Sequence, residues 1–276
     1  MNLLLVRQLL QQALIEDIGT RDLTTELLFE PGDMLSGMLL AKKEGRIAGL
    51  SVAEEVFRLL DPQIRFAGQA ADGTDVKAGE RIATVTGRAR AILSGERIAL
   101  NFLQRMSGIA TATRDVCRSV ADLPVRIADT RKTMPGLRLF DKHAVAVGGG
   151  INHRFGLYDA VMIKDNHIAA SGSIRAAAAK VKRGAGHLVK IEVEAETLDQ
   201  VKEAVEAGVD VILLDNMSPE MMREAVQIVG GRAVTEASGG ITPETVREYA
   251  VTGVDVISLG WLTHSVKALD ISLDLT

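Results

Sequence analysis

Apolar residues in the first hundred positions follow two different periods. Over 2–16 they recur at helical spacing, which predicts an amphipathic helix. Residues 35–50 alternate as two short strands around the turn KKEG, and Ser51 and Glu54 have the spacing of a capping box that would start a helix. Strand-like runs broken by glycine come next, and a long helical pattern begins near Arg88. This half therefore predicts a separate α+β layer with helices on a mostly antiparallel sheet.

Beyond residue 121 short β-rich runs alternate with helical stretches that end in glycine, as in TLDQVKEAVEAG. The runs cover residues 125–129, 160–165, 188–194, 210–215, 232–238 and 255–260. This βα alternation predicts a parallel sheet or barrel. The tail VKALDISLDLT leaves the pattern and alternates, so we expect it to return as a strand of the N-terminal sheet.

Each of the six runs is apolar through its body and polar where it ends. The polar residues are Asp129, Lys164, Glu192 with Glu194, Asp215, Glu236 with Ser238, and Ser258. One such residue alone would be read as an ordinary cap between a strand and a helix. In a β/α barrel, however, strand ends form a single rim, and active sites lie there. Six polar ends in succession therefore predict an active-site rim.

Cationic side chains gather in the stretch 130–167, which holds six Lys or Arg residues against three Asp, and three of the five histidines. The whole chain has a net charge of -4, so this excess is local. A solvated basic loop is the alternative interpretation. The stretch is interleaved with apolar residues and with the triplet Gly148–Gly150, which would let backbone approach a ligand. We therefore expect a pocket for a strongly anionic ligand.

Two glycine loops, 237–244 and 258–265, come after the last predicted strands. The first is expected to enter a helix capped at Thr242 with Pro243 in its first turn. Backbone N–H groups at such a helix start suit phosphate, and the loops after the final barrel strands are the usual phosphate site of this architecture.

Composition limits the other function classes. The net charge of -4 and an isoelectric point near 5.8 argue against a nucleic-acid-binding or membrane-binding surface. Cys117 is the only cysteine, which excludes a disulfide framework and a thiolate metal cluster. The N-terminus lacks the features of a signal peptide, so we expect a cytoplasmic protein.

Several strings together give the chain a resemblance to one family. They are EDIGTRDLTT, ERIALNFLQRMSGIAT, TRKTMPGLR, GGGINHRFGLYDAVMIKDNHI, IEVE, LLDNMSPE, EASGGI and SLGWLTHSVKALDISLDL. The chain resembles quinolinate phosphoribosyltransferases, also called carboxylating nicotinate-nucleotide pyrophosphorylases, over essentially its full length. The resemblance implies an α/β fold with an N-terminal α/β sandwich domain (1–105) and an incomplete seven-stranded α/β barrel (106–265), the strand 266–276 returning to the sandwich.

The resemblance also implies an activity. Phosphoribosyl would pass from 5-phosphoribosyl 1-pyrophosphate to quinolinate with decarboxylation, giving nicotinate mononucleotide, pyrophosphate and CO2 for NAD biosynthesis. The implied substrate-binding residues are Arg105, Thr130, Arg131, Lys132, His153, Arg154, Lys164, Glu194, Asp215, Ser238, Gly239, Gly240, Ser258, Leu259 and Gly260. Lys132, Lys164, Glu194 and Asp215 would be the catalytic residues.

The family further implies Mg²⁺, held by Glu194 and Asp215 partly through pyrophosphate, and a homodimer or larger homo-oligomer in which Arg105 enters a neighbouring subunit's site. Three alternatives stay open at this point. They are a related pyrophosphorylase with another acceptor, an aldolase-type barrel that forms a Schiff base at Lys164, and a non-catalytic anion sensor. The acids Glu194 and Asp215 speak against the sensor, because a pure anion binder gains nothing from carboxylates.

Overall fold

The computed structural model describes residues 1–276, which form two compact units. The first unit comprises residues 1–114, 133–149 and 263–276, and the second comprises residues 115–132 and 150–262. None of the helices combines the length and the apolar character needed to span a membrane.

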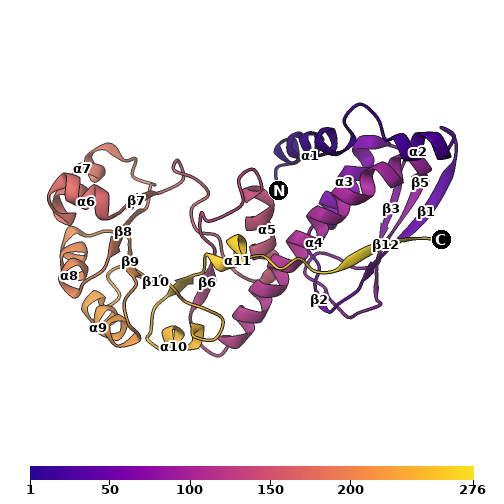
Figure 1. The fold of residues 1–276 in the computed structure, drawn as a ribbon. Helices are drawn as coiled ribbons and strands as arrows, with labels where there is room; N and C mark the ends of the chain where they lie inside the picture. Colours follow the sequence, from indigo (N-terminus) through magenta and orange to yellow (C-terminus); the bar gives the residue numbers. More distant parts are fainter. The chain divides into compact units, whose positions relative to one another are not determined.

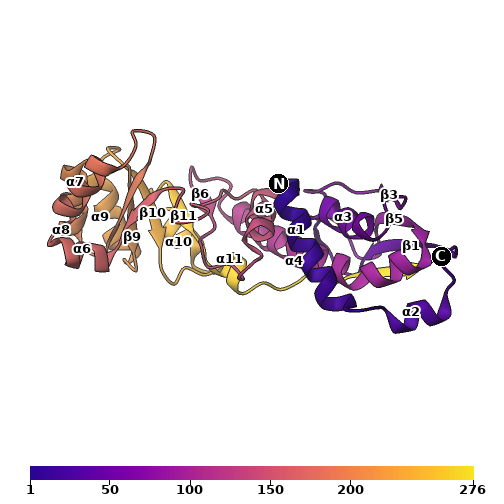
Figure 2. The ribbon, with the colours of Figure 1, turned by 90° about the horizontal axis from the view of Figure 1, so that it is seen from above.

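The first unit is built on an antiparallel sheet with the strand order β12-β1-β5-β3 (Figure 1). Its strands are β1 (Met34–Ala41), β3 (Arg65–Gly68), β5 (Arg81–Arg88) and β12 (Ile271–Leu275), and a separate ladder joins β2 (Gly45–Arg46) to β4 (Asp75–Val76). Its helices are α1 (Leu3–Ile18), α2 (Leu23–Leu28), α3 (Leu50–Leu60), α5 (Arg138–Gly148) and most of α4 (Ala89–Ser119). Phe57 of α3 stacks on Phe66 of β3, so α3 covers one face of the sheet (Figure 2).

The C-terminal strand returns to the N-terminal sheet as expected. β12 pairs antiparallel with β1, with Leu275 opposite Gly37 and Ile271 opposite Ala41. The two strands expected on either side of the KKEG turn are present as β1 and β2. They do not pair with each other, because β1 pairs with β5 and β12 while β2 pairs with β4.

Helix α3 begins differently from the predicted capping box. Its N-cap is Gly49, in a left-handed conformation, and Ser51 lies inside the helix. The carboxylate of Asp72 accepts hydrogen bonds of 3.0 Å from the N–H groups of Gly49 and Leu50. A side chain more than twenty positions away thus satisfies the helix start, so the local Ser51/Glu54 pattern did not decide it.

The predicted domain boundary between residues 105 and 106 falls inside a continuous helix. α4 runs from Ala89 to Ser119, and the two units meet in the chain between Arg114 and Asp115. Helix α5, which was assigned to the barrel, belongs to the first unit.

The glycine triplet that follows AVAV ends α5. A Cβ at Gly148 would lie 2.5 Å from Cβ of Thr113 and 2.7 Å from the carbonyl oxygen of Ala110, both on α4. Gly149 has φ +102° and caps the helix. The glycines therefore allow α5 to approach α4 closely and then to stop.

The second unit is a parallel sheet with the strand order β6-β11-β10-β9-β8-β7, and helices cover its outer face (Figure 1). The strands are β6 (Arg126–Ala128), β7 (Val161–Ile163), β8 (Ile191–Ala195), β9 (Val211–Asp215), β10 (Val234–Ser238) and β11 (Val256–Ser258). The helices are α6 (Asp165–Ser171), α7 (Ile174–Gly184), α8 (Leu198–Ala207), α9 (Pro219–Val229) and α10 (Val246–Ala250), and α11 (Trp261–His264) follows them in the chain.

The expected barrel is incomplete, as predicted, but its strand count differs. Six strands form the sheet, and Ile151 adds an isolated parallel bridge to Ala128 on the outer edge of β6. This single bridge takes the position of a seventh strand. The segment around Ile151 contributes only this one paired residue, which explains why no strand pattern is visible there in the sequence.

Candidate active site

The polar strand ends predicted from the sequence lie along one edge of the parallel sheet. Glu194 on β8 pairs in register with Leu213 on β9, and Asp215 at the end of β9 pairs with Ser238 at the end of β10. Parallel strands place their carboxyl ends at the same edge, so the expected polar rim is confirmed for Glu194, Asp215 and Ser238. Glu192 and Glu236, also expected at strand ends, lie within β8 and β10 instead. Lys164 follows β7 at this edge as the N-cap residue of α6.

Lys164, Glu194 and Asp215 form a charged cluster on adjacent strands. Nζ of Lys164 lies 2.5 Å from Oε2 of Glu194. Burial and the nearby Glu194 carboxylate raise the pKa of Asp215, an effect that Lys164 and Lys132 partly oppose. A Schiff-base lysine must present a free amine to its substrate, whereas Nζ of Lys164 is held by the carboxylate of Glu194, so this geometry disfavours the aldolase alternative.

A third acid joins Glu194 and Asp215. Carboxylate oxygens of Glu194, Glu196 and Asp215 all lie within 4.8 Å of one another. Hard divalent cations such as Mg²⁺ prefer oxygen ligands from one or two carboxylates together with substrate phosphates. The donor set therefore fits the Mg²⁺ implied by the family, and Glu196 adds an acid that the sequence analysis did not single out.

Arg131 and Arg154 form a second, cationic part of the rim. Arg154 donates from Nη1 to the carbonyl oxygen of Ala160 at 3.0 Å. Partial burial, and then the charge of Arg131, lower the pKa of Arg154, while Glu192 opposes this shift. The two guanidinium groups are close enough to repel each other, and a bound dianion would relieve that repulsion.

The loop that carries Arg131 begins with a local turn. The N–H of Lys132 donates to Oγ1 of Thr130 at 3.0 Å. This bond fixes the backbone between Thr130 and Lys132 directly after Asp129, which is fully buried at the end of β6. Thr130 therefore acts on the shape of this loop.

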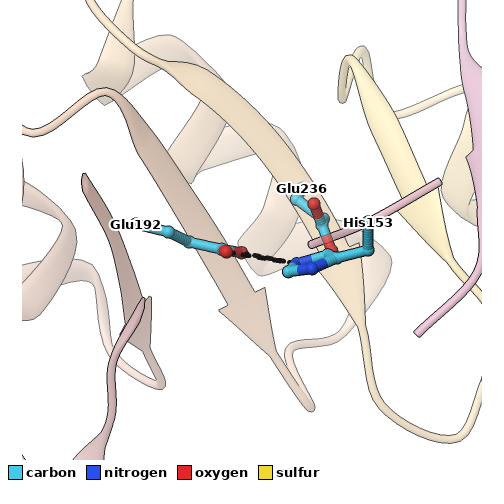
Figure 3. Close-up of side chains that lie close together, drawn as sticks. All are labelled: His153, Glu192 and Glu236. Atoms are coloured by element: carbon cyan, nitrogen blue, oxygen red, sulfur yellow. Dashed lines mark hydrogen bonds and ion pairs between the residues drawn. The ribbon is translucent and has the colours of Figure 1, made fainter. Parts of the chain in front are cut away.

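His153 lies among buried acids rather than open to solvent. Its Nε2 is 3.1 Å from Oε2 of Glu192 and 3.6 Å from Oε1 of Glu236, and its Nδ1 is 2.7 Å from the backbone nitrogen of Arg154 (Figure 3). Both ring nitrogens are thus engaged within the protein. The resemblance implies that His153 binds substrate. In the structure it directly precedes Arg154 and accepts a hydrogen bond from its backbone N–H, and its contact with substrate stays a prediction.

The first glycine loop has a different geometry from the one expected. Helix α10 begins at Val246, so the predicted helix start at Thr242 and Pro243 is wrong. Gly239 has φ +97°, and a Cβ there would lie 2.2 Å from Oδ1 of Asn216. Asn216 is itself the only non-glycine residue with positive φ. The loop is therefore shaped by close backbone packing against the end of β9, and any phosphate contact must come from loop N–H groups, not from a helix start.

The second glycine loop is tied to its neighbours. The N–H of Leu259 donates to the carbonyl oxygen of Ala128 at 2.9 Å, and its side chain is buried, so Leu259 holds the loop in place and offers no free N–H to phosphate. Nε1 of Trp261 donates to the carbonyl oxygen of Ile241 at 3.1 Å. This bond joins the two glycine loops, a role that the sequence did not suggest.

Arg105 is the only candidate that belongs to the first unit. Its Nε and Nη2 each lie 2.8 Å from an oxygen of the fully buried Asp141, and Nη2 also donates to the carbonyl oxygen of Thr263. This bidentate pair ties α4 to α5.

Several residues in the site were noted in the sequence only as polar strand ends, or were missed. Glu192, Glu236 and Asp129 surround His153 although none had an assigned role. Asn216 was missed because a positive φ is invisible in sequence unless glycine occupies the position. Its position directly after Asp215, the last residue of β9, was the one feature of the sequence that could have pointed to it.

Family models match nearly the whole chain. The N-terminal domain model of quinolinate phosphoribosyl transferase matches residues 22–107, and the C-terminal domain model matches residues 109–274. The chain belongs to the quinolinate phosphoribosyltransferase family. The order of the two domain models along the chain agrees with the sandwich and barrel halves expected from the sequence.

Individual relatives extend this similarity over full lengths. The chain is 51% identical over 276 residues to a probable carboxylating nicotinate-nucleotide pyrophosphorylase of Bacillus subtilis, which covers 100% of this chain and 95% of the relative. The crystal structure of NadC from Streptococcus pyogenes superimposes with a TM-score of 0.96 at 42% identity, covering 100% and 98% of the two chains. The nicotinate-nucleotide pyrophosphorylase of Francisella tularensis gives a TM-score of 0.94 at 39% identity, covering 99% and 96%.

Proposed function

We propose that this protein is a decarboxylating quinolinate phosphoribosyltransferase. It transfers phosphoribosyl from 5-phosphoribosyl 1-pyrophosphate to quinolinate and produces nicotinate mononucleotide, pyrophosphate and CO2. One observation carries the proposal: two charged groups occur together in the second unit. The first is the pair of guanidinium groups Arg131 and Arg154, which repel each other, and the second is the cluster of Lys164, Glu194 and Asp215.

Each half of this arrangement suits one substrate. Quinolinate carries two carboxylates, and Arg131 and Arg154 provide two planar donors that match carboxylate geometry. Departure of pyrophosphate leaves positive charge on the ribose, and the fixed carboxylates of Glu194 and Asp215 stabilise that charge as it develops. No side chain needs to act as a nucleophile.

The cations have a second task after transfer. Loss of the 2-carboxylate as CO2 leaves an electron pair at C2 of the pyridine ring, which then takes up a proton from solvent. Positive groups that hold the ring stabilise that electron pair while it is present. Lys132 and Lys164 both lie near the acids, since both charges act on Asp215. We assign these two lysines to the boundary between quinolinate and the phosphate groups.

Glu194, Glu196 and Asp215 are the residues that would hold Mg²⁺. When bound, the ion neutralises charge on the leaving pyrophosphate. The phosphate at the 5′ position is assigned to the loops that contain Ser238, Gly239, Gly240 and Gly260. This assignment rests on their place after β10 and β11, the usual phosphate position in barrels.

The oligomeric state forms part of the proposal. We assign the active enzyme as a homodimer in which Arg105 reaches the active site of the neighbouring subunit. Nε and Nη2 of Arg105 hold Asp141, so Nη1 is the end that would meet a substrate carboxylate. The cytoplasmic location stays a prediction.

Product analysis tests the function directly. The protein is mixed with phosphoribosyl pyrophosphate, Mg²⁺ and either quinolinate or nicotinate, and the nucleotide product is separated and identified. We expect nicotinate mononucleotide from quinolinate and none from nicotinate. Arg131→Ala and Arg154→Ala should each reduce kcat/KM for quinolinate by about a hundredfold or more, because each removes a charge-assisted contact of about 3 kcal/mol.

A matched variant separates charge at the site from charge in general. Arg175→Ala removes an exposed arginine that pairs with Glu206 on the surface, and its kcat/KM should stay within about twofold of the wild type. Formation of nucleotide from nicotinate, or equal loss in all three variants, would contradict the assignment of substrate and site.

A further inference from the structure

Three acids, one directly after β6, one within β8 and one within β10, surround His153. Oδ1 of Asp129, after β6, accepts a 2.8 Å hydrogen bond from the backbone N–H of His153. Glu192 on β8 lies 3.1 Å from Nε2, and Glu236 on β10 lies 3.6 Å from the same nitrogen. Figure 3 shows the two glutamates approaching the ring from different strands. The histidine is therefore a junction between strands that are not neighbours in the sheet.

The proton on the imidazole can be placed from its contacts. Nδ1 lies 2.7 Å from the backbone nitrogen of Arg154, which can only donate. Nδ1 must then be the acceptor, so the proton of the neutral ring is on Nε2 and points toward Glu192 and Glu236. One N–H group meets two carboxylates, and it cannot neutralise both.

Glu236 is the carboxyl group left without full compensation. Its side chain is 6% exposed, and its Oε1 makes no hydrogen bond. Burial and the neighbouring Glu192 raise the pKa of Glu236 to about 7, Asp129 adds to this shift, and His153 and a hydrogen bond from Ser258 oppose it. An isolated buried carboxylate with an unpaired oxygen is costly, and a proton removes that cost.

We propose that Glu236 is a positioning residue which acts as a neutral carboxylic acid, holding His153 and through it the backbone of Arg154 for quinolinate, so that quinolinate binding is linked to proton uptake. This inference rests on the proposed function and assigns Glu236 a role that neither the fold nor the family match supplies. Glu236 is buried and lies 3.6 Å from Nε2 of His153, so we assign its effect to the histidine.

Charge balance explains why the proton favours binding. Arg154 follows His153 directly in the chain. The acids Asp129, Glu192 and Glu236 all contact His153. A dianionic ligand held by Arg154 would be repelled by three carboxylates and by only two when Glu236 is protonated. A protonated Glu236 keeps its carbonyl oxygen facing Nε2–H of His153, so the imidazole stays between the two strands.

The expected pH dependence has a definite sign. Below pH 7 Glu236 holds its proton and the site is ready for quinolinate; above pH 7 the proton must be taken up on binding. The KM for quinolinate should then rise with pH, approaching tenfold per pH unit for one linked proton. Carboxyl groups like those of quinolinate titrate near pH 4, far below this window, so the slope reports the protein.

Glu236→Gln provides the decisive variant because it keeps the shape and cannot ionise. At saturating phosphoribosyl pyrophosphate, its KM for quinolinate should match the wild type at pH 6.5 and vary by less than about twofold up to pH 8.5, while the wild-type KM rises more than about tenfold. Glu236→Ala should raise KM at every pH, because it also removes the support of His153. Glu224→Gln on α9 gives the matched exposed control and should follow the wild type.

Calorimetry counts the proton without relying on turnover. Quinolinate is titrated into the protein in two buffers of different ionisation enthalpy at pH 7.5. The wild type should take up a substantial fraction of one proton, and Glu236→Gln should take up none. A pH-dependent KM that persists in Glu236→Gln, or equal proton uptake in both proteins, would overturn the proposal. Absence of any product from quinolinate in the wild type would instead overturn the proposed function, and the two failures are distinct.

Discussion

The contact between α5 and α4 depends on the missing side chain at Gly148, and Gly148→Ala tests this dependence. The added Cβ would lie 2.5 Å from Cβ of Thr113 and 2.7 Å from the carbonyl oxygen of Ala110, against about 3.5 to 4.0 Å for ordinary carbon contacts. The oxygen belongs to helical backbone and the Cβ of Thr113 cannot rotate away, so α5 itself must shift. Overpacking of this kind costs about 1 to 3 kcal/mol.

The chain contains a matched control for the intrinsic effect of the substitution. Gly184 is the last residue of α7, as Gly148 is the last residue of α5, and no atom lies within 4 Å of a Cβ built there. Alanine gains roughly 0.5 kcal/mol over glycine in a helix by losing less backbone entropy. This gain is common to both variants. The difference between their changes in free energy of unfolding therefore isolates the cost of the close contact, about 1 to 3 kcal/mol.

Differential scanning calorimetry measures the outcome. At about 2 to 4 °C per kcal/mol for a chain of this size, Gly148→Ala should melt about 2 to 12 °C below a reference set by Gly184→Ala. If the two units melt separately, Gly148→Ala should lower only the transition of the first unit and Gly184→Ala should raise only that of the second. Equal melting temperatures for the two variants would refute the argument that the glycine is required by helix approach.

Two other substitutions test the charges of the fold and the site. Asp141→Ala leaves Arg105 without its bidentate partner at a fully buried position and should destabilise the protein by about 3 to 5 kcal/mol in urea unfolding. Asp122→Ala breaks an exposed pair with Arg247 and should change the free energy of unfolding far less, so equal effects would contradict a structural role for the buried pair. Asp215 has a raised pKa, so the folded state binds its proton more tightly than the unfolded state does, and the carboxylate destabilises the fold above the ordinary value of 3.8. Asp215→Asn should therefore raise the melting temperature at neutral pH, lose that gain below pH 3.8, and abolish phosphoribosyl transfer; a lower melting temperature at neutral pH would contradict the sign of the shift.

The sequence alone determined the features that repeat with a local period. Helical spacing over 2–16 produced α1, Leu3–Ile18, and the βα alternation produced the parallel sheet. The apolar strand bodies with polar ends gave the rim at which Glu194 and Asp215 meet. These features are visible because a period of 2 or 3.6 residues decides which side chains face the core.

Tertiary structure decided the features that depend on distant partners. The start of α3 is satisfied by Asp72, far along the chain, and the glycines after AVAV serve the packing of α5 on α4. The proton on Glu236 follows from its burial beside Glu192 and His153, three residues that no local pattern joins. Long-range caps, close helix contacts and shared protons arise only when the chain folds, because each depends on distances between atoms that the order of residues does not specify.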